Sequence, residues 1–272
     1  MSNEKVTTKK YALIGENIGY SLSPKIHAAI YEKFSVAYAS YKLFDIKSEN
    51  LETEIINLKK LNGFNVTKPY KQKIIQFLDK IDNEKFSAVN TVVNKKGALI
   101  GYNTDYIGFL HHIKELREKS KIDIYNRPAL VLGAGGVAEV IVPALMALGA
   151  DVHIYNRTEK KAIALAKKFS AKVAACKNEK SYYVVVNCTS CGLQNGEDMS
   201  TNLDFSSTAL AYDTIYFDTL FLQSAKSAGV LVAENGLNML LYQAIAAHEI
   251  FFDVKIKNRI PTKDFIIEKL QI

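Results

Sequence analysis

The sequence predicts an α/β protein with two domains: an N-terminal open α/β domain with mostly parallel strands, and a second series of βαβ units followed by C-terminal helices. Short β-type runs alternate with helical patterns along almost the whole chain, which is typical of parallel sheets covered by helices. The pattern breaks around residues 120–127 and then starts afresh. With 272 residues, 48% of them hydrophobic, the chain is long enough for two domains of ordinary size.

The first domain is expected to begin with a strand at residues 11–15, YALIG. A helix follows over residues 23–34, because Ile26 and Ile30 recur at helical spacing after Ser23 as N-cap and Pro24 at the first helical position. The next elements, in order, are a strand at 38–46, a helix at 48–60, a strand at 63–67, a helix at 70–79, strands at 89–94 and 98–103, and a helix after Asp105.

The second domain opens with PALVLGAGG and continues as βαβ units to about residue 240. The last stretch, NMLLYQAIAAHEIFF and then PTKDFIIEKL, contains two helical patterns with no strand between them. Such helices must cover an existing sheet, and we expect them to return to the first domain. The expected boundaries are residues 1–106, 107–237 and 238–272 for the two domains and the C-terminal helices.

The charge and hydropathy patterns exclude several classes of protein. The net charge is +7, but the lysines occur as scattered pairs rather than as one stripe, which favours a solvated surface over a nucleic-acid interface. No apolar run approaches the roughly 20 residues of a membrane helix, and the first residues lack the apolar core of a signal peptide. We therefore expect a cytoplasmic protein, either a monomer or a homodimer, that binds neither nucleic acid nor membranes.

The cysteines and the N-x-T sequons of this chain do not fit their usual roles in disulfide bonding and glycosylation. The three cysteines are too few and of the wrong parity for a disulfide framework. Three N-x-T sequons occur, at Asn65, Asn156 and Asn187. In a secreted protein each would be a glycosylation candidate, but the expected location of this chain requires another role for them.

The segment ALVLGAGGVAEV carries the most informative motif. Gly133, Gly135 and Ala138 form a G-x-G-x-x-A arrangement directly after an apolar strand and at the start of a helical pattern. This is the context that a dinucleotide-binding fingerprint requires. Gly133 permits the tight turn, Gly135 lets backbone amides approach a pyrophosphate at the positive end of the helix, and Ala138 keeps helix and strand close. A glycine-rich connection without a ligand is the alternative reading.

The strand after this helix, DVHIYNRT, ends where such folds place the group that reads the adenosine ribose. An NAD enzyme usually has Asp or Glu there, whereas this chain has Asn156, Arg157 and Thr158, with Lys160 and Lys161 close behind. A guanidinium can bind a 2′-phosphate that a carboxylate would repel. The cofactor is therefore predicted to be NADP(H); the alternative is that Arg157 is a solvated charge and Thr158 only a helix cap.

A C-x-x-C pair lies in NCTSCG, residues 187–192, after the apolar run YYVVV. Because the chain has no second cysteine pair and no H-x-x-x-H partner, we expect neither a metal site nor a redox dithiol. We expect instead that the end of this strand faces the cofactor, where Asn187, Thr189 and Ser190 offer polar contacts.

Four apolar segments of the first domain each run into polar residues. They are IGYSLS, FNVT, AVNT and GYNTD, which contribute Ser21, Ser23, Asn65, Thr67, Asn90, Thr91, Asn103 and Asp105. In an open α/β sheet, ligands bind outside the carboxyl ends of the strands. If these ends converge, they form a pocket suited to a small molecule with several hydroxyl groups. Turn chemistry alone could account for any single one of the four segments.

A polyol pocket beside an NADP domain implies hydride exchange between an alcohol carbon and nicotinamide, and the protein must supply the proton carrier. No Tyr-x-x-x-Lys pair accompanies the cofactor motif, and no histidine falls within the strand-end motifs. Lys71 and Asp105 are the natural candidates. A carboxylate favours the charged form of a neighbouring lysine, which suits proton donation to a ketone. The alternative is an ordinary surface salt bridge.

Taken together, these motifs resemble the shikimate dehydrogenase family over nearly the whole chain. The matching stretches are SLSP at 21–24, NVTKPYK at 65–71, AVNT at 88–91, GYNTD at 101–105, GAGGVA at 133–138, NRT at 156–158, NCTSCG at 187–192 and GLNMLLYQA at 236–244. The resemblance implies a substrate domain, a Rossmann-type NADP-binding domain, and NADPH-dependent reduction of 3-dehydroshikimate to shikimate. One departure is Tyr106, where the family usually has Gly after the catalytic acid.

The resemblance also implies a role for each site residue. Those matching Lys71 and Asp105 form the catalytic pair. The substrate-binding residues are expected to be Ser21 and Ser23 at the carboxylate, Tyr216 near it, and Asn65, Thr67, Asn90, Asp105 and Gln243 at the hydroxyls. The cofactor-binding residues are expected to be Gly133, Ala134, Gly135, Gly136, Val137, Ala138, Asn156, Arg157, Thr158, Lys161, Thr189, Ser190, Gly236 and Met239.

Three other functions remain open at this point. A quinate/shikimate dehydrogenase with relaxed substrate or cofactor choice shares the same motifs. A non-catalytic protein that binds NADPH and senses a metabolite is the alternative of another class. A folate-type dehydrogenase has a similar two-domain plan, but a hydroxyl-rich first domain suits a planar pterin poorly.

Overall fold

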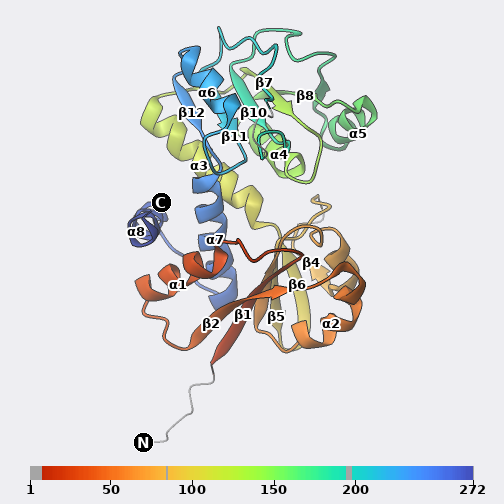
Figure 1. Ribbon diagram of the computed structural model, residues 1–272, viewed down its shortest axis with the longest axis vertical. Helices are drawn as coiled ribbons and strands as arrows, with labels where there is room; N and C mark the ends of the chain where they lie inside the picture. The colour runs from red at the N-terminus through yellow and green to blue at the C-terminus, as the bar shows by residue number, and fades with distance from the viewer. Residues whose placement is uncertain (1–7, 84, 194–197, 272) are drawn as a thin grey trace, which may run out of the picture. The chain divides into compact units, whose positions relative to one another are not determined.

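The computed structural model describes residues 8–83, 85–193 and 198–271, and it divides into two compact units (Figure 1). The first unit contains the residues up to Thr104 together with those from Leu241 onward, and the second runs from Asp105 to Leu240. The chain therefore leaves the first unit at the start of helix α3, Thr104–Ser120, and re-enters it within helix α7, Leu237–Phe252.

The first unit is built on a six-stranded sheet with the order β2-β1-β3-β5-β6-β4. All neighbouring strands are parallel except that β5 runs antiparallel to β3 and to β6, so the expectation of a mostly parallel sheet is confirmed. The strands are β1 Lys9–Gly15, β2 Ala39–Asp45, β3 Gly63–Val66, β4 Lys80–Ile81, β5 Thr91–Lys95 and β6 Ala98–Tyr102. The short strand β4 has no counterpart among the expected elements.

The helices of the first unit follow the expected order with two differences. They are α1 Ser23–Lys33, the 3-10 helix η1 Ser48–Asn50, α2 Leu51–Leu58, the 3-10 helix η2 Lys73–Phe77, most of α7, and α8 Ile260–Leu270. Ser23 is not the N-cap, because Leu22 occupies that position and Ser23 donates its backbone N–H to Ser21 Oγ at 3.2 Å. The expected helix at 70–79 is reduced to η2, since Tyr70 is drawn into the core, where its hydroxyl donates to Ile46 O at 2.6 Å.

Alternate residues of β1 face two different cores, as the period of a strand requires. Ala12 and Ile14 pack in a cluster with Phe64, Val66 and Leu58 of α2. Tyr11 points to the other face, where its ring stacks on Phe251 of α7 with centroids 4.5 Å apart and its hydroxyl donates to Phe251 O at 3.1 Å. Helix α7 therefore covers the second face of the first sheet and α8 packs against α1, so both C-terminal helices return to the first unit, as expected.

The second unit contains a fully parallel six-stranded sheet in the order β12-β11-β10-β7-β8-β9. Reversed, this is the strand order of a doubly wound dinucleotide-binding fold. The strands are β7 Pro128–Leu132, β8 Asp151–Tyr155, β9 Lys172–Val173, β10 Val184–Asn187, β11 Leu210–Asp213 and β12 Val232–Glu234, and the helices besides α3 are α4 Ala138–Ala147, α5 Glu159–Phe169 and α6 Leu220–Ser227. The Rossmann-type prediction is confirmed.

The turn from β7 to α4 depends on Gly133. Its φ angle is +103°, a region that side-chain-bearing residues rarely adopt. A Cβ atom built there would lie 2.9 Å from Thr189 Cγ2 and 3.3 Å from the carbonyl of Cys188. At Gly136, in contrast, an added Cβ meets nothing within 4 Å.

Among the described residues, no helix combines the length and the apolar character needed to cross a bilayer.

Two buried imidazoles lie where α1 and α7 pack in the first unit. His27 stacks on Tyr41 with centroids 4.0 Å apart, and His248 stacks on Phe252 at 4.5 Å. Burial lowers the pKa of His27 to about 3, and the neighbouring charge of His248 acts in the same direction. Burial lowers the pKa of His248 to about 4. Both rings are therefore uncharged at neutral pH.

We expect these histidines to make the protein acid-sensitive. Their folded-state pKa values lie below the unfolded value near 6.5, so the unfolded state binds more protons and stability falls as the pH drops from about 6.5 towards 4. The substitution His248→Phe should flatten this dependence. Urea unfolding of both proteins between pH 7 and pH 4.5 measures it, and equal slopes would contradict the assignment.

The substitution Gly133→Ala should destabilise the protein by roughly 1–3 kcal/mol, because a side chain is forced into a strained backbone conformation. Gly136→Ala is the matched control, with an expected change within about 0.5 kcal/mol. Urea unfolding measures both variants. Similar losses in the two would show that the turn tolerates a Cβ at Gly133.

Candidate functional site

A buried network of amides and hydroxyls joins the strand ends of the first unit. Asn90 Oδ1 accepts hydrogen bonds from Thr104 N at 2.7 Å and Thr91 Oγ1 at 3.1 Å. Asn65 Nδ2 donates to Thr91 Oγ1 at 2.9 Å and to Asn90 O at 3.2 Å. All four side chains are at least 95% buried. The network therefore fixes the amides of two strand ends in one orientation.

Two further residues extend this network. Gln243 Oε1, on α7, accepts from Thr104 Oγ1 at 3.3 Å and from Asn90 Nδ2 at 3.5 Å. Tyr41, on β2, donates its hydroxyl to Asn65 Oδ1 at 2.8 Å. The structure thus brings together three residues that the sequence singled out for substrate binding: Asn65, Asn90 and Gln243. Tyr41 was not predicted as a site residue. The only sequence feature that pointed to it was its position in the strand expected at 38–46.

Ser21 and Ser23 lie at the start of α1. Ser21 Oγ donates to Ser23 Oγ at 3.2 Å, and both residues are half-buried. His27 lies four residues after Ser23 on the same face of α1 and is 1% exposed. A side-chain hydrogen bond with Asn65 partly offsets the lowering of its pKa by burial. Ser23, to which Ser21 is hydrogen-bonded, therefore lies on the helix face that carries His27 towards the amide network, and the sequence did not single out His27.

The segment NVTKPYK places Lys71 by anchoring the residues around it. Thr67 is half-buried, and its methyl group lies 2.6 Å from where a Cβ on Gly15 would be. Tyr70 is fully buried, and the carbonyl of Lys71 accepts a hydrogen bond from Val89 N at 2.8 Å. Lys71 itself is half-buried. The segment therefore holds a partly accessible ammonium on a fixed backbone.

Asp105 and Tyr106 occupy the first turn of α3 and belong to the second unit. Both are half-buried. A carboxylate is stabilised at the positive end of a helix. Because Thr104 N is bonded to Asn90 Oδ1, the start of α3 is tied to the network described above.

The second unit contains a cavity of about 280 Å³ at the carboxyl ends of β7, β8 and β10. It is lined by Gly133, Ala134, Gly135, Asn156, Arg157, Thr158, Lys161, Cys188, Thr189 and Ser190. All of these except Cys188 were predicted from the sequence. Cys188 lies within the NCTSCG motif, and its position directly after a buried strand was the available signal.

Hydrogen bonds hold the loops of this cavity in place. Ala134 N donates to Asn156 Oδ1 at 3.1 Å, and Asn156 Nδ2 donates to Thr158 O at 2.9 Å. Thr189 Oγ1 donates to Asn187 Oδ1 at 2.7 Å. A Cβ at Gly135 would meet nothing within 4 Å, so a ligand can approach the backbone there. With α4 and α5 both beginning beside these loops, the cavity has the properties of an anion site.

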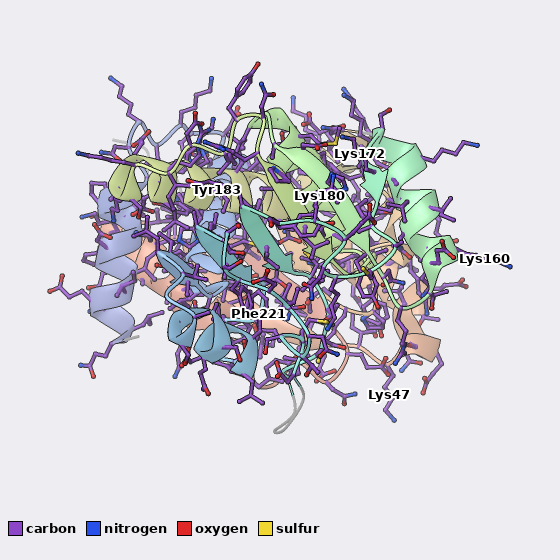
Figure 2. The ribbon with its side chains drawn as sticks, turned by 90° about the horizontal axis from the view of Figure 1, so that it is seen from above. Lys47, Lys160, Lys172, Lys180, Tyr183 and Phe221 are labelled. Atoms are coloured by element: carbon purple, nitrogen blue, oxygen red, sulfur yellow. The ribbon has the colours of Figure 1, made fainter. Side chains whose placement is uncertain are left out.

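The cations at this cavity are exposed. Arg157 and Lys161 line it, while Lys160 does not; Figure 2 shows Lys160 on the outer side of α5, extending away from the sheet. A second cavity of about 220 Å³ shares Asn156 and Arg157 and has an apolar wall that includes Val173 and Ala174. Arg157 therefore lines both cavities.

Several predicted residues lie outside the cavity. Ala138 is fully buried behind the glycine loop, between helix and strand as expected. Gly236 donates its N–H to Ile215 O at 2.9 Å, and a Cβ there would lie 2.4 Å from Thr214 O. The others are Gly136 and Val137 on the same loop, buried Met239 in the first turn of α7, and Tyr216, 41% exposed, with its ring edge-on to Phe217.

The structure also explains the sequons and the cysteines. Asn65 and Asn187 are at least 95% buried, so neither side chain is accessible to a glycosylating enzyme. Asn187 Nδ2 donates to Cys191 O at 3.2 Å and to Asp213 Oδ2 at 3.1 Å. Burial raises the pKa of the Cys188 thiol, and none of the three cysteines, all of which lie in the described residues, forms a disulfide. Among the described residues, no group of His, Cys, Asp and Glu side chains could hold a metal ion.

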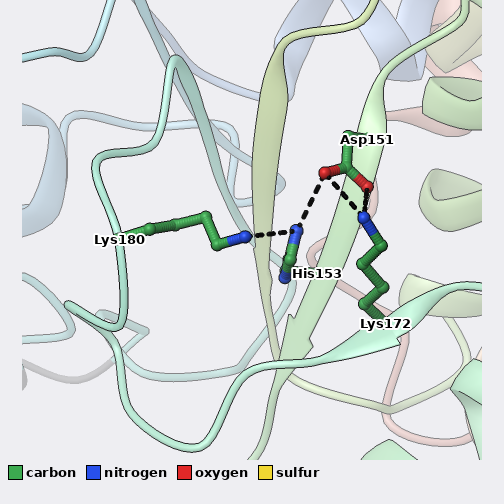
Figure 3. Close-up of polar contacts among 4 residues, drawn as sticks. All are labelled: Asp151, His153, Lys172 and Lys180. Carbon is green, nitrogen blue, oxygen red and sulfur yellow. Dashed lines mark hydrogen bonds and ion pairs between the residues drawn. The ribbon is translucent and has the colours of Figure 1, made fainter.

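An ionic cluster lies at the opposite end of β8 from the cavity. Figure 3 shows Asp151 bonded to Lys172 and to His153, whose ring nitrogen is also 3.3 Å from Lys180 Nζ. The hydrogen bond from Lys172 lowers the pKa of Asp151 against the opposing effect of burial. None of the four residues lines the cavity; they surround the start of β8, which begins at Asp151.

The chain resembles known proteins along most of its length. Residues 13–92 match the family model of the shikimate dehydrogenase substrate binding domain, and residues 115–189 match that of shikimate / quinate 5-dehydrogenase. The shikimate dehydrogenase (NADP(+)) of Caldanaerobacter subterraneus is 39% identical over 287 residues, which cover 97% of each chain. That of Nitrosopumilus maritimus is 39% identical and covers 89% of this chain and 93% of its own.

Solved structures agree with these matches. The shikimate dehydrogenase of Aquifex aeolicus superposes with a TM-score of 0.87 at 33% identity and full coverage of both chains. The enzyme of Thermus thermophilus in complex with NADP(H) and shikimate gives a TM-score of 0.84 at 30% identity, covering 96% of this chain and all of that one. The chain belongs to the shikimate dehydrogenase family.

Proposed function

We propose that this protein is an NADP-dependent shikimate dehydrogenase that interconverts 3-dehydroshikimate and shikimate. The observation that carries the proposal is the cavity in which Arg157, Thr158 and Lys161 adjoin the glycine loop of a parallel doubly wound sheet. Its donor set suits a dinucleotide with an additional phosphate. Relatives with 39% identity over most of the chain are named for this activity.

The cofactor is assigned to the second unit. Backbone amides of the loop from Gly133 to Ala138 bind the pyrophosphate, and Arg157, Thr158 and Lys161 bind the 2′-phosphate. Thr189, Ser190, Gly236 and Met239 are assigned to the nicotinamide half. When bound, NADPH supplies the hydride. The end of β8 carries Asn156, Arg157 and Thr158 where an NAD enzyme usually has Asp or Glu, which favours NADP over NAD.

The substrate is assigned to the amide network of the first unit. Ser21 and Ser23 donate their hydroxyls to the substrate carboxylate, with Tyr216 as a further donor. Asn65, Thr67, Asn90 and Gln243 bind the ring hydroxyls. Because the amides are already held by Thr91, Thr104 and Tyr41, little ordering is needed when the substrate binds.

Lys71 and Asp105 are assigned to proton transfer. During reduction, hydride reaches the carbonyl carbon while the Lys71 ammonium donates a proton to the carbonyl oxygen, so the ketone becomes an alcohol. During oxidation, the pair accepts the proton that the alcohol releases. Asp105 accepts a hydrogen bond from the same hydroxyl and stabilises the charged form of the lysine.

Replacing the proton carrier should reduce turnover more than binding. We expect Lys71→Ala to lower kcat by roughly 10²–10⁴-fold and to change the KM for shikimate much less, because other residues hold the substrate. Lys73→Ala, an exposed lysine two residues further on, is the matched control. Steady-state assays measure both. An equal effect on kcat and KM would make Lys71 a binding residue.

Replacing the guanidinium should affect NADPH alone. We expect Arg157→Gln to raise the KM for NADPH by roughly 10- to 100-fold, the value of one or two charge-assisted hydrogen bonds, and to leave the KM for NADH unchanged. Lys160→Gln serves as the control. If both cofactors lose affinity equally, Arg157 does not read the 2′-phosphate.

Assays with different substrates and cofactors distinguish the proposed activity from the two alternative functions. NADPH consumption with 3-dehydroshikimate and none in the reverse assay with quinate and NAD supports the proposed activity. Activity in both assays identifies the quinate/shikimate alternative, which the name of the second matched family model also covers. NADPH binding without turnover of either substrate identifies a non-catalytic metabolite-binding protein.

A further inference from the structure

The first unit contains a larger cavity of about 640 Å³ that shares no residue with the amide network. This volume is within the roughly 300–1,000 Å³ of small-molecule sites. We call it the lysine pocket. It is lined by Lys9, Lys33, Phe34, Val36, Tyr38, His248, Phe252, Val254, Lys255, Ile256, Lys257, Asn258, Pro261 and Thr262.

Aromatic rings form an apolar wall of the lysine pocket. His248 lies between Phe34, at 5.3 Å and 21°, and Phe252, at 4.5 Å and 29°. Because its pKa is lowered to about 4 by burial, the imidazole is neutral and belongs to this wall. Phe34 and Tyr38 are each 39% exposed, and Val254 is 46% exposed. The pocket therefore offers partly exposed apolar surface to a ligand.

The charge on the lysine pocket is entirely positive. Four of its lining residues are lysines, Lys9, Lys33, Lys255 and Lys257, and none is Asp or Glu. Lys9 Nζ lies 5.1 Å from the centre of the Phe252 ring, and Lys33 Nζ lies over Phe265. Within the described part of the chain, no carboxylate forms an ion pair with any of the four. An anion is thus the complementary ligand.

The loop that carries Lys255 and Lys257 is held in place. Glu249 Oε1 accepts from Ile256 N at 2.8 Å and from Arg259 Nε at 3.3 Å, and Glu249 O accepts from Val254 N at 3.0 Å. The Glu249 carboxylate is neutralised by Arg259, with which it forms a half-buried ion pair. The wall of the pocket is therefore preformed, which limits the entropy lost on binding.

We propose that the lysine pocket binds a small aromatic carboxylate. The aromatic body packs on the rings of Phe34, Tyr38 and Phe252, and the carboxylate faces the ammonium groups of Lys255 and Lys257. The ligand differs in kind from the polyhydroxylated substrate proposed above, because the lining offers few neutral donors besides Tyr38, Asn258 and Thr262. The inference does not depend on the proposed activity.

Three probes test the chemistry of the ligand: 2-naphthoate, its neutral isostere 2-naphthamide, and cyclohexanecarboxylate. Isothermal titration of the full chain should show one site per chain for 2-naphthoate, with the other two at least about 10-fold weaker, since a tenfold loss corresponds to about 1.4 kcal/mol. Saturating shikimate should leave 2-naphthoate binding unchanged. Raising the salt concentration should weaken it.

Surface variants test the location. The double variant Lys255→Gln, Lys257→Gln should bind 2-naphthoate at least about 10-fold more weakly and keep wild-type shikimate kinetics, because both residues are exposed and outside the proposed active site. The matched control is Lys47→Gln, Lys160→Gln, which removes two exposed lysines that do not line the pocket. The variant Val36→Trp, in which the larger side chain should fill the pocket, should abolish binding of 2-naphthoate.

Several results would overturn the proposal. Displacement of 2-naphthoate by shikimate would place the probe in the substrate site. Equal binding of 2-naphthamide would show apolar adsorption without anion recognition, and equal effects of the two double variants would show nonspecific attraction to lysines. Absence of any binding up to about 10 mM, an affinity weaker than about 3 kcal/mol, would also exclude the site.

Discussion

The hydrogen bonds of the Asn90 side chain and backbone are the constraint on which the first unit and its candidate site depend. Its Oδ1 fixes the first residue of α3, its carbonyl accepts from Val66 N and from the Asn65 side chain, and its Nδ2 reaches Gln243 on α7. One buried amide therefore ties together two strand ends and the two helices in which the chain passes between units. Leaving one of these buried polar groups without a hydrogen bond would destabilise the protein by about 1–3 kcal/mol. Each residue of the network is therefore needed to satisfy the hydrogen bonds of its neighbours.

The cavity of the second unit depends on a residue without a side chain, Gly133, in the turn after β7. Gly133 closes the turn after β7 because no Cβ fits beside Thr189, and the same close approach brings Thr189 and Ser190 of one strand end against the glycine loop of another. Asn156 then joins that loop to the end of β8. The result is a concave surface of amides and hydroxyls with Arg157 and Lys161 at its edge, a combination that binds phosphate through both dipoles and charges.

The basic composition of the chain is divided among sites with different physical roles. Lys172 and Lys180 flank an Asp–His pair and support the start of β8 (Figure 3). Arg157 and Lys161 line an anion cavity. The lysines of the lysine pocket have no carboxylate partner in the described residues, and two of them, Lys9 and Lys33, stand over aromatic rings. A net charge alone could not distinguish these situations, because screening and pairing decide what each cation does.

The sequence by itself determined the two sheets, the glycine turn and the residue types at the strand ends, because periodicity and the steric needs of glycine act over a few residues. It therefore located Asn65, Asn90, Gly133 and Arg157. Only the tertiary structure decided which of them meet, and with what partners. Asn90 and Gln243 are 153 positions apart, and Tyr41, His27 and the lysine pocket carry no local motif. Contacts of this kind follow from how sheets and helices pack, which a linear pattern does not encode.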